Sequence, residues 1–299
     1  MTGARIPRIV FLVVVVVAVF SRIGGAQAKS EHDKVTLMPA VVIVGSPELI
    51  RVAAPDAQSV TGDWQGRKLE FFRGQDGKLW FALAGVDVEA QAGTSTLHIA
   101  AQTAGAAVIE LTRIIEIHAA HYRTGTITVA PKFVEPGPEE LKQIKAEVEL
   151  KNKVFGTSAT EPLWSGDFRA PVQAAPTDSF GTRRTYNGQL QSIHKGMDFR
   201  APTGTVVRAG NSGVVVLAQP LYYEGNCVAI DHGLGLFTIS MHLSKIDVHE
   251  GQRVVKRQRI GLSGATGRVT GPHLHWAVRW EGAYLDPAKL LAMNFNGVR

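Results

Sequence analysis

The stretch His194-Lys195-Gly196-Met197-Asp198 places two strong metal ligands four positions apart around a glycine. At this spacing His194 and Asp198 would share one face of a helix. Pro202 and Gly204 follow closely and disfavour a helix. The sequence therefore predicts a tight turn that runs into a strand. Taken alone, so short a motif is common by chance, and a surface histidine beside a solvated aspartate is the simpler interpretation.

Two further stretches carry histidines on predicted strands. From Phe237 to Ser244 apolar and polar residues alternate, which predicts a half-buried strand with His242 on its polar face. In the stretch 271–280, His273 and His275 should point the same way, about 6 to 7 Å apart. A single histidine on a strand is usually only a satisfied polar side chain. Two histidines on one face of a strand are more typical of a metal or catalytic site.

In order and spacing these motifs resemble the lysostaphin-type, or LytM-like, zinc peptidases that cut peptidoglycan. The family pattern is H-x-G-x-D, then H-L-S, then G-P-H-L-H. The matching segments are His194-Lys195-Gly196-Met197-Asp198, His242-Leu243-Ser244 and Gly271-Pro272-His273-Leu274-His275. Residues 225–233 and 261–267 are also similar to family strands and turns. The resemblance covers about residues 161 to 299, and the chain departs from it at Ser240, where the family often has an aromatic residue.

The resemblance implies a role for each of five side chains. His194, Asp198 and His275 would be zinc ligands, and His242 and His273 would be the unligated catalytic pair. Three protein ligands with one position open for water are typical of a catalytic zinc, and a His/Asp set suits this metal. Spacing alone does not distinguish the ligand among His273 and His275. The implied reaction is attack of zinc hydroxide on a peptide carbonyl, with the catalytic pair orienting water, stabilising the oxyanion and relaying a proton.

The fold class predicted is all-β, with an immunoglobulin-like β-sandwich over residues 29–133. Seven short runs with turn signals between most of them support this prediction. They are Ala40 to Val44, Leu49 to Ala53, Lys68 to Arg73, Lys78 to Leu83, Thr96 to Ala100, Val108 to Ile117 and Thr126 to Ala130. Glu116, His118 and His121 could form a second metal site, but solvated histidines at a strand end are the simpler interpretation. The domain is interpreted as a spacer, a binding module or a cover over the catalytic groove.

A helical linker is predicted over residues 134–160. Pro138 suits the first helical position, acidic residues follow it, and Leu141, Ile144 and Val148 form one apolar stripe. Residues 161–299 should then form the LytM-like peptidase domain, an antiparallel β-sheet with the site on its floor.

Residues 1–28 have the pattern of a secretory signal peptide. Arg5 and Arg8 precede twelve apolar residues, and Ala26-Gln27-Ala28 is a small-x-small cleavage site, so the mature chain should begin at Lys29. An uncleaved anchor is the alternative. The predicted location is therefore periplasmic or extracellular, with no membrane contact after cleavage.

Cys227 is the only cysteine, so no intramolecular disulfide can form. It lies in an apolar run, which favours a small buried side chain over the activated nucleophile of a cysteine peptidase.

Charge is unevenly distributed. Residues 29–178 hold 15 basic and 19 acidic residues, a net charge of −4, and residues 179–299 hold 14 and 7, a net charge of +7. A basic half suits an acidic polymer such as the cell wall, and nothing indicates nucleic acid. The densest basic cluster, Arg253, Lys256, Arg257 and Arg259, is either a solvated hairpin tip or a substrate contact. Opposite charges also predict intramolecular docking of the two halves, which would make a protein cut near residue 161 more active at low salt.

The function predicted is an exported zinc endopeptidase that hydrolyses peptide cross-links of peptidoglycan, with one Zn²⁺ per chain and stem peptides and cross-bridges as its partners. Two alternatives stay open. One is a non-enzymatic LytM-like activator of a cell-wall amidase, and the other is a wall-binding module with a structural zinc. A missing ligand would favour the first, and none is missing. Two unligated histidines disfavour the second, because a structural site would use its histidines as ligands.

Overall fold

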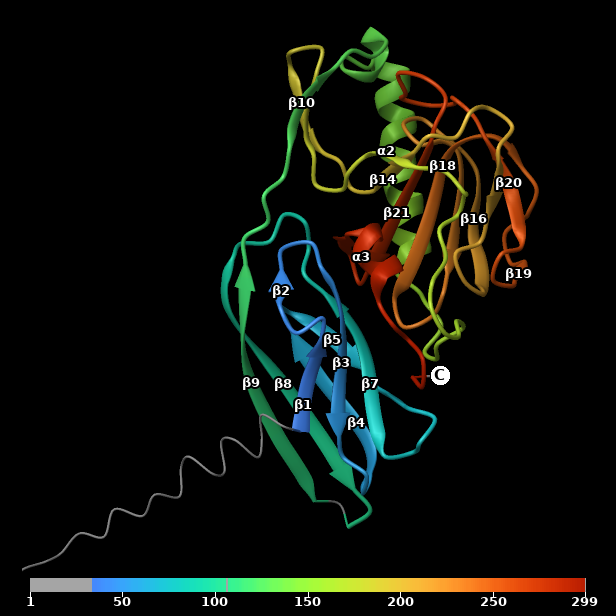
Figure 1. The fold of residues 1–299 in the computed structure, drawn as a ribbon. Coiled ribbons are helices and arrows are strands. Elements are labelled where there is room, and N and C mark those ends of the chain that lie inside the picture. The colour runs from blue at the N-terminus through green and yellow to red at the C-terminus, as the bar shows by residue number, and fades with distance from the viewer. Residues whose placement is uncertain (1–33, 106, 299) are drawn as a thin grey trace, which may run out of the picture.

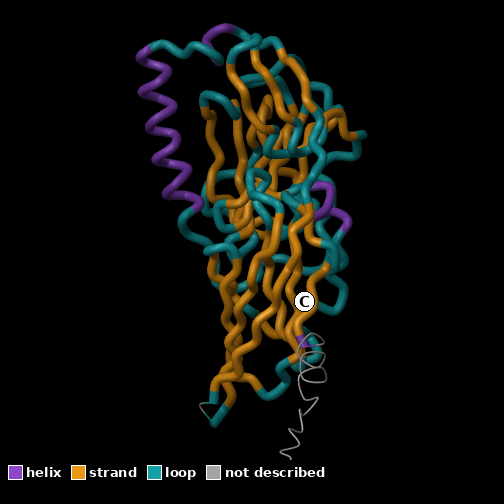
Figure 2. Tube along the Cα trace, turned by 90° about the vertical axis from the view of Figure 1, so that its left-hand side faces the viewer, coloured by secondary structure: helices purple, strands orange, loops and turns teal. Residues whose placement is uncertain are grey.

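The computed structural model describes residues 34–105 and 107–298, so the predicted signal peptide and the predicted start at Lys29 lie outside the described residues. Figure 1 shows two groups of strands stacked end to end along one long axis, and the side view in Figure 2 shows the same arrangement. Helices are few, which confirms the all-β fold class. Within the described part of the chain, no helix is both long and apolar enough to span a membrane.

Two sheets form the N-terminal group. The first has the order β1 (Val35–Met38), β3 (Pro47–Ala53), β7 (Leu79–Gly85), β6 (Phe72–Arg73). The second has the order β2 (Val42–Ile43), β9 (Val108–His118), β8 (Gly93–Thr103), β4 (Ala57–Trp64), β5 (Arg67–Glu70). Ile50 of the first sheet and Leu97 and Ile99 of the second belong to one buried cluster, as expected where two sheets pack face to face. The immunoglobulin-like topology and the bounds 29–133 stay predictions.

One strand predicted for this sandwich lies elsewhere. Thr126 to Ala130 was expected as its last strand, but β10 (Thr124–Ile127) pairs in parallel with β12 (Arg183–Tyr186) of the C-terminal half. β12 in turn pairs with β13 (Leu190–Ile193), which completes a three-stranded sheet. The prediction is wrong because an alternating run indicates a strand without indicating which sheet it joins.

Glu48 is a fully buried carboxyl group in β3. The Ser46 hydroxyl lies 2.7 Å from the Ile43 carbonyl oxygen, to which only the hydroxyl can donate, and 2.6 Å from Glu48 Oε1. The hydroxyl has one hydrogen and therefore donates to only one of these two oxygens at a time. Burial raises the pKa of Glu48 to about 8 and outweighs the hydrogen bond from Ser46, which lowers it, so most of this carboxyl group is protonated near pH 7.

Glu48→Gln is expected to stabilise the fold in alkaline solution. The pKa of about 8 lies above the ordinary value of 4.5, so the native state holds a proton that the unfolded chain has lost between these pH values. The free energy of unfolding of the wild type should therefore fall as pH rises from 4.5 to about 8. Glutamine keeps the shape of the side chain and an oxygen that can accept from Ser46, and it has no proton to lose. Urea titrations should show a gain of about 2 to 4 kcal/mol at alkaline pH and none in acid. A gain independent of pH would contradict a neutral Glu48.

The C-terminal sheet is antiparallel and holds the predicted motifs. Its main path has the order β11 (Pro176–Asp178), β14 (Met197–Phe199), β21 (Leu274–Trp280), β18 (Leu236–Ile246), β17 (Gly225–Asp231), β16 (Gly213–Leu221), β19 (Arg253–Val254). Three further strands join it, β15 (Val206–Arg208), β20 (Arg259–Ser263) and β22 (Ala283–Leu285). The antiparallel arrangement agrees with the prediction, whereas the domain bounds 161–299 stay a prediction.

Helix α2 (Pro138–Phe155) has proline at its start, as predicted, and packs on β16. The predicted apolar stripe is not its packed face, because Leu141 and Val148 are 53% and 47% exposed. The residues that pack on the sheet are Leu150, Val154 and Phe155, beside a cluster that includes Cys227, Ala229 and Ala277. Buried Glu147 adds a polar contact, since it accepts hydrogen bonds from the Tyr222 backbone. The stripe prediction failed because the helix contacts the sheet mainly through its second half.

Two short helices, η1 (Pro131–Phe133) and α3 (Pro287–Ala292), complete the part of the chain that the structure describes. η1 follows β10 directly, and Phe133 lies in a small buried cluster with Val129 and Tyr186. The segment that leaves the N-terminal sheets is therefore anchored on the C-terminal half before α2 begins.

The N-terminal sheets contact the C-terminal sheet close to the first metal motif. In the loop after β7, the Val88 N–H donates to the Tyr284 carbonyl, and Glu89 lies 2.7 Å from the ammonium of Lys195. Phe72 and Trp164 add an apolar contact, with ring centroids 5.9 Å apart. Salt does not screen apolar contacts of this kind, unlike the charge attraction from which docking was predicted. That the N-terminal domain covers the catalytic groove and regulates it stays a prediction.

Candidate metal centre and active site

Neighbouring strands bring the motif residues together. Asp198 in β14 is the register partner of His275 in β21, and His275 is the register partner of Met241 in β18. His242 follows Met241 directly. Asp198 and His275 are 77 positions apart in the sequence and Met241 and His275 are 34 apart, yet they lie side by side because the order β14-β21-β18 places their strands next to each other.

His194 lies in the predicted turn between β13 and β14 and is buried. Its Nδ1 lies 2.9 Å from the Ser179 carbonyl oxygen. Because a carbonyl only accepts, Nδ1 carries the hydrogen, and Nε2 of the neutral ring has a free lone pair. That nitrogen lies 3.0 Å from Asp198 Oδ1 and 2.9 Å from His275 Nδ1.

His194, Asp198 and His275 form a compact donor set. Their candidate ligand atoms all lie within 4.8 Å of one another, and no other such group of three or more occurs among residues 34–105 and 107–298. Two donors on one zinc, at about 2.0 to 2.2 Å each, lie at most about 4 Å apart. The contacts among His194 Nε2, Asp198 Oδ1 and His275 Nδ1 are 2.9 to 3.0 Å long and meet this limit. Burial lowers the pKa of His275 to about 4, so this ring is neutral near pH 7. Neutral imidazoles and an ionised carboxylate fit a zinc ion.

Arg184 holds the other oxygen of the Asp198 carboxylate. Its Nη2 donates to Asp198 Oδ2 at 2.7 Å and to Asp178 Oδ2 at 2.6 Å. The carboxylate therefore presents Oδ1 to the two histidines. Burial tends to raise the pKa of Asp198, but its contacts with the His194 and His275 rings outweigh burial and hold the pKa well below its usual range. Groups that orient a ligand in this way tune metal affinity.

Gly196→Ala is expected to weaken metal binding. A methyl group there would overlap the His275 imidazole and lie 2.7 Å from the Trp276 carbonyl oxygen, so the ring or the strand must move. Disturbing the support of a ligand typically costs about 10- to 100-fold in affinity. Gly125→Ala is the matched control, since nothing lies within 4 Å of its added methyl group. Competition with a chelator would measure the metal affinity of both variants. An unchanged affinity in Gly196→Ala would show that the added methyl group does not displace His275.

His242 and His273 lie beside the donor set, with ring centroids 5.0 Å apart. His242 Nδ1 lies 2.8 Å from the Thr266 carbonyl and His273 Nδ1 lies 2.8 Å from the Gly271 carbonyl, so in each ring Nδ1 donates and Nε2 is the free nitrogen. Burial lowers the pKa of His242 to about 3. With Nδ1 as the donor, the neutral form of each ring presents a lone pair at Nε2.

The half-buried strand predicted around His242 is fully buried over most of its length. Thr238 and Ser240, expected on a solvated face, are 2% and 3% exposed. His242 has a positive φ of 62°, a conformation uncommon for residues other than glycine, and the register of β18 shifts next to it. Alternating polar and apolar residues wrongly predicted a solvated face, because both faces of this central strand are covered.

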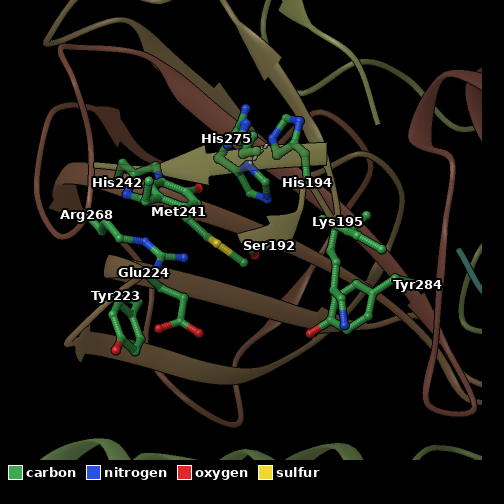
Figure 3. Close-up of a pocket in the computed structure, with 13 residues that line it drawn as sticks. Ser192, His194, Lys195, Tyr223, Glu224, Met241, His242, Arg268, His275 and Tyr284 are labelled. Carbon is green, nitrogen blue, oxygen red and sulfur yellow. Dashed lines mark hydrogen bonds between the residues drawn. The ribbon is translucent and has the colours of Figure 1, made fainter. Parts of the chain in front are cut away.

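Two cavities, of about 190 and 320 Å³, lie at the site and share Arg184, Tyr186, His242 and Arg268 in their walls. Figure 3 shows the first, with Arg268 and Tyr223 near His242 and with Lys195 and Tyr284 on the side of His194. The second also contains Asp198 and His273, and Ile127 and Val129 of the segment around β10. The arrangement is a groove that passes the candidate metal centre.

Other residues singled out in the sequence lie outside this groove. Ser240 is buried in β18, and the rings at the cavities come from Tyr186, Tyr223 and Tyr284. Cys227 is buried, as predicted. Glu116 and His118 are largely exposed, with 72% and 50% of their side chains accessible.

Most of the basic cluster predicted as a hairpin tip or a substrate contact binds the protein itself. Lys256 donates to the Ser165 and Asp167 carbonyls, Arg257 to the Ala170 carbonyl and Arg259 to Asp247. A structural role therefore accounts for these three side chains. Sequence reasoning missed Arg184 and Arg268, because single arginines carry no spacing signal and only the excess of basic residues in this half pointed to them.

Comparison with known proteins places the motifs in a family. Residues 192–287 match the model of peptidase family M23. The peptidoglycan DD-endopeptidase ShyA of Vibrio cholerae is 50% identical over 96 residues, which are 32% of this chain and 22% of that protein. ShyB of the same organism, also named a peptidoglycan DD-endopeptidase, is 42% identical over 125 residues, 40% of this chain and 29% of that protein. The chain thus spans less than a third of the length of these relatives.

A solved structure extends the likeness to most of the chain. The putative peptidase M23 from Pseudomonas aeruginosa has a TM-score of 0.63 and 26% sequence identity, over 83% of this chain and 94% of that one. The match therefore includes both groups of strands. The resemblance predicted from the motifs is confirmed, and the chain carries a peptidase family M23 domain at residues 192–287.

Proposed function

We propose that the protein is an exported zinc endopeptidase that hydrolyses peptide cross-links of peptidoglycan. The observation that carries the proposal is the buried donor set of His194, Asp198 and His275 at the floor of a groove, with two further histidines beside it. Relatives named peptidoglycan DD-endopeptidases support the substrate class. A substrate in the cell wall and the signal-like pattern of residues 1–28 support a periplasmic or extracellular location.

Each of the five side chains has a role in the proposed reaction. His194, Asp198 and His275 would hold one zinc ion, which when bound polarises a carbonyl and lowers the pKa of water. His242 and His273 use Nδ1 to contact backbone carbonyls and keep Nε2 free to take a proton from the attacking water and give it to the leaving amine. As imidazolium ions they also stabilise the negative charge that develops on the substrate oxygen.

The alternatives receive less support. An amidase activator needs no donor set, whereas here all three ligand side chains are in place. A wall-binding module with a structural zinc would use His242 and His273 as further ligands, yet neither belongs to the compact donor set.

Digestion of purified cell walls tests the proposal. The protein should release fragments with a new amine and a new carboxylate at a peptide cross-link, which mass spectrometry identifies. Activity should disappear with a chelator and return with zinc. Cleavage between the glycan and the stem peptide would indicate an amidase instead, and unchanged activity in the chelator would contradict a metal centre.

A further inference from the structure

Arg268 is a cation held between aromatic side chains at the groove. Its guanidinium carbon lies 4.5 Å from the ring centroid of Tyr186 and 4.5 Å from that of Tyr223. Its backbone N–H donates to the Tyr223 carbonyl, which fixes the main chain as well. Contacts with aromatic faces hold a guanidinium in place without using its N–H groups as hydrogen-bond donors.

The other cations near the first cavity already have carboxylate partners. Arg184 binds Asp178 and Asp198, and Lys195 lies 2.7 Å from Glu89. The guanidinium of Arg268 has no hydrogen bond or ion pair with any residue that the structure describes. The guanidinium of Arg268 is thus held in place by two rings, while its N–H groups remain available to donate to a ligand.

Arg268 also lies next to the catalytic pair. It lines both cavities together with His242, and it follows by two residues Thr266, whose carbonyl holds the His242 ring. Figure 3 shows the guanidinium beside His242 in the first cavity. A group bound by Arg268 would therefore lie close to the bond that is cut.

We propose that Arg268 binds a free carboxylate of the substrate peptide, the one nearest to the scissile amide. The proposal rests on the function proposed above and adds a specificity determinant to it. A guanidinium donates two parallel hydrogen bonds to a carboxylate, and fixing it beforehand reduces the entropy lost on binding. The planar guanidinium of Arg268 also fits a phosphate group, but the proposed peptide substrate supplies carboxylates.

Glu224, which lines the same cavity, does not neutralise this site. Its Oε1 accepts from Lys151 at 2.6 Å, so its charge is paired within the protein. The preference for a carboxylate over a neutral group should therefore come from Arg268.

Two cross-linked peptides that differ in one group would test the inference. In the first peptide the carboxylate nearest to the scissile amide is free, and in the second it is a carboxamide. The wild type should cleave the free acid with a kcat/KM about 10- to 100-fold higher, the effect expected for charged hydrogen bonds. Arg268→Gln should lose this factor on the acid and change less than about twofold on the amide.

Matched variants separate a specific contact from general effects. Arg253→Gln removes one exposed positive charge from β19, which lines neither cavity, and should leave both rates unchanged. Tyr223→Leu removes one of the two ring contacts and should lower only the rate on the acid, because the guanidinium is less well fixed.

Binding gives a readout that does not depend on turnover. Zinc-loaded His242→Ala should bind the acid at least tenfold more tightly than the amide in calorimetry, and adding Arg268→Gln should abolish the difference. Equal kcat/KM values for the two peptides in the wild type, or equal losses on both in Arg268→Gln, would overturn the inference. If the wild type cleaved neither peptide, the proposed function would fail, and the ratio of binding constants would still decide the role of Arg268.

Discussion

His242→Ala is expected to keep its zinc and to lower kcat for cross-link hydrolysis by about 10² to 10⁴-fold. The reason is that His242 contributes no atom to the compact donor set, while its Nε2 is free and its Nδ1 is fixed by the Thr266 carbonyl. Loss of a positioned general acid or base typically has an effect of this size. Metal analysis and wall-digestion kinetics on the same preparation would measure both quantities.

The backbone at His242 requires a control. Its φ of 62° lies in a region that alanine rarely adopts and that asparagine tolerates better. His242→Asn should therefore fold as the wild type and remain as slow as His242→Ala. Recovery of activity in the asparagine variant would show that the alanine variant failed through backbone strain. Zinc loss in both variants would make His242 a ligand and refute the proposed division of roles.

Asp198→Ala is expected to lose zinc and activity together. The variant lacks the one charged donor of the set and leaves the buried Arg184 with Asp178 as its remaining carboxylate partner. Affinity should fall by more than the 10- to 100-fold typical of residues that only support a ligand. Activity at limiting zinc should fall in proportion and recover partly when zinc is added in excess.

Asp198→Asn provides the matched comparison, because it keeps the shape of the side chain and removes its charge. Its amide group cannot satisfy both Arg184 and the metal as the carboxylate does, so zinc affinity should lie between those of the alanine variant and the wild type. If Asp198→Ala retained one zinc per chain at wild-type affinity, the aspartate would not be a ligand, and the donor set proposed here would be wrong.

Much of the C-terminal half could be predicted from local patterns. The turn around Gly196 followed from a glycine and from the breakers after Asp198, and the strands followed from short alternating runs. The order of the histidine motifs was sufficient for the family resemblance, since such motifs pair residue type with fixed spacing. The assignment of individual ligand and catalytic roles stays a prediction until the variants are measured.

In the first half, local patterns indicated strands but missed β4. Its buried side chains, Ala57, Val60 and Trp64, are separated by polar residues at irregular intervals, and the register of the strand shifts between Ala57 and Ser59. A bulge of this kind breaks the two-residue period on which strand prediction depends. The strand is recognisable only once its neighbour β8 is in place.

The amino-acid sequence by itself singled out the candidate metal ligands and catalytic histidines and the order in which they occur. Only the tertiary structure decided which other residues reach them. Strand order places Asp198 opposite His275, a crossover brings β10 to β12, and the fold sets Arg268 against Tyr186 and Tyr223. The physical reason is that the spacing within each motif is encoded in one turn or strand, whereas these contacts join segments far apart in the sequence, whose pairing depends on the burial of the whole core.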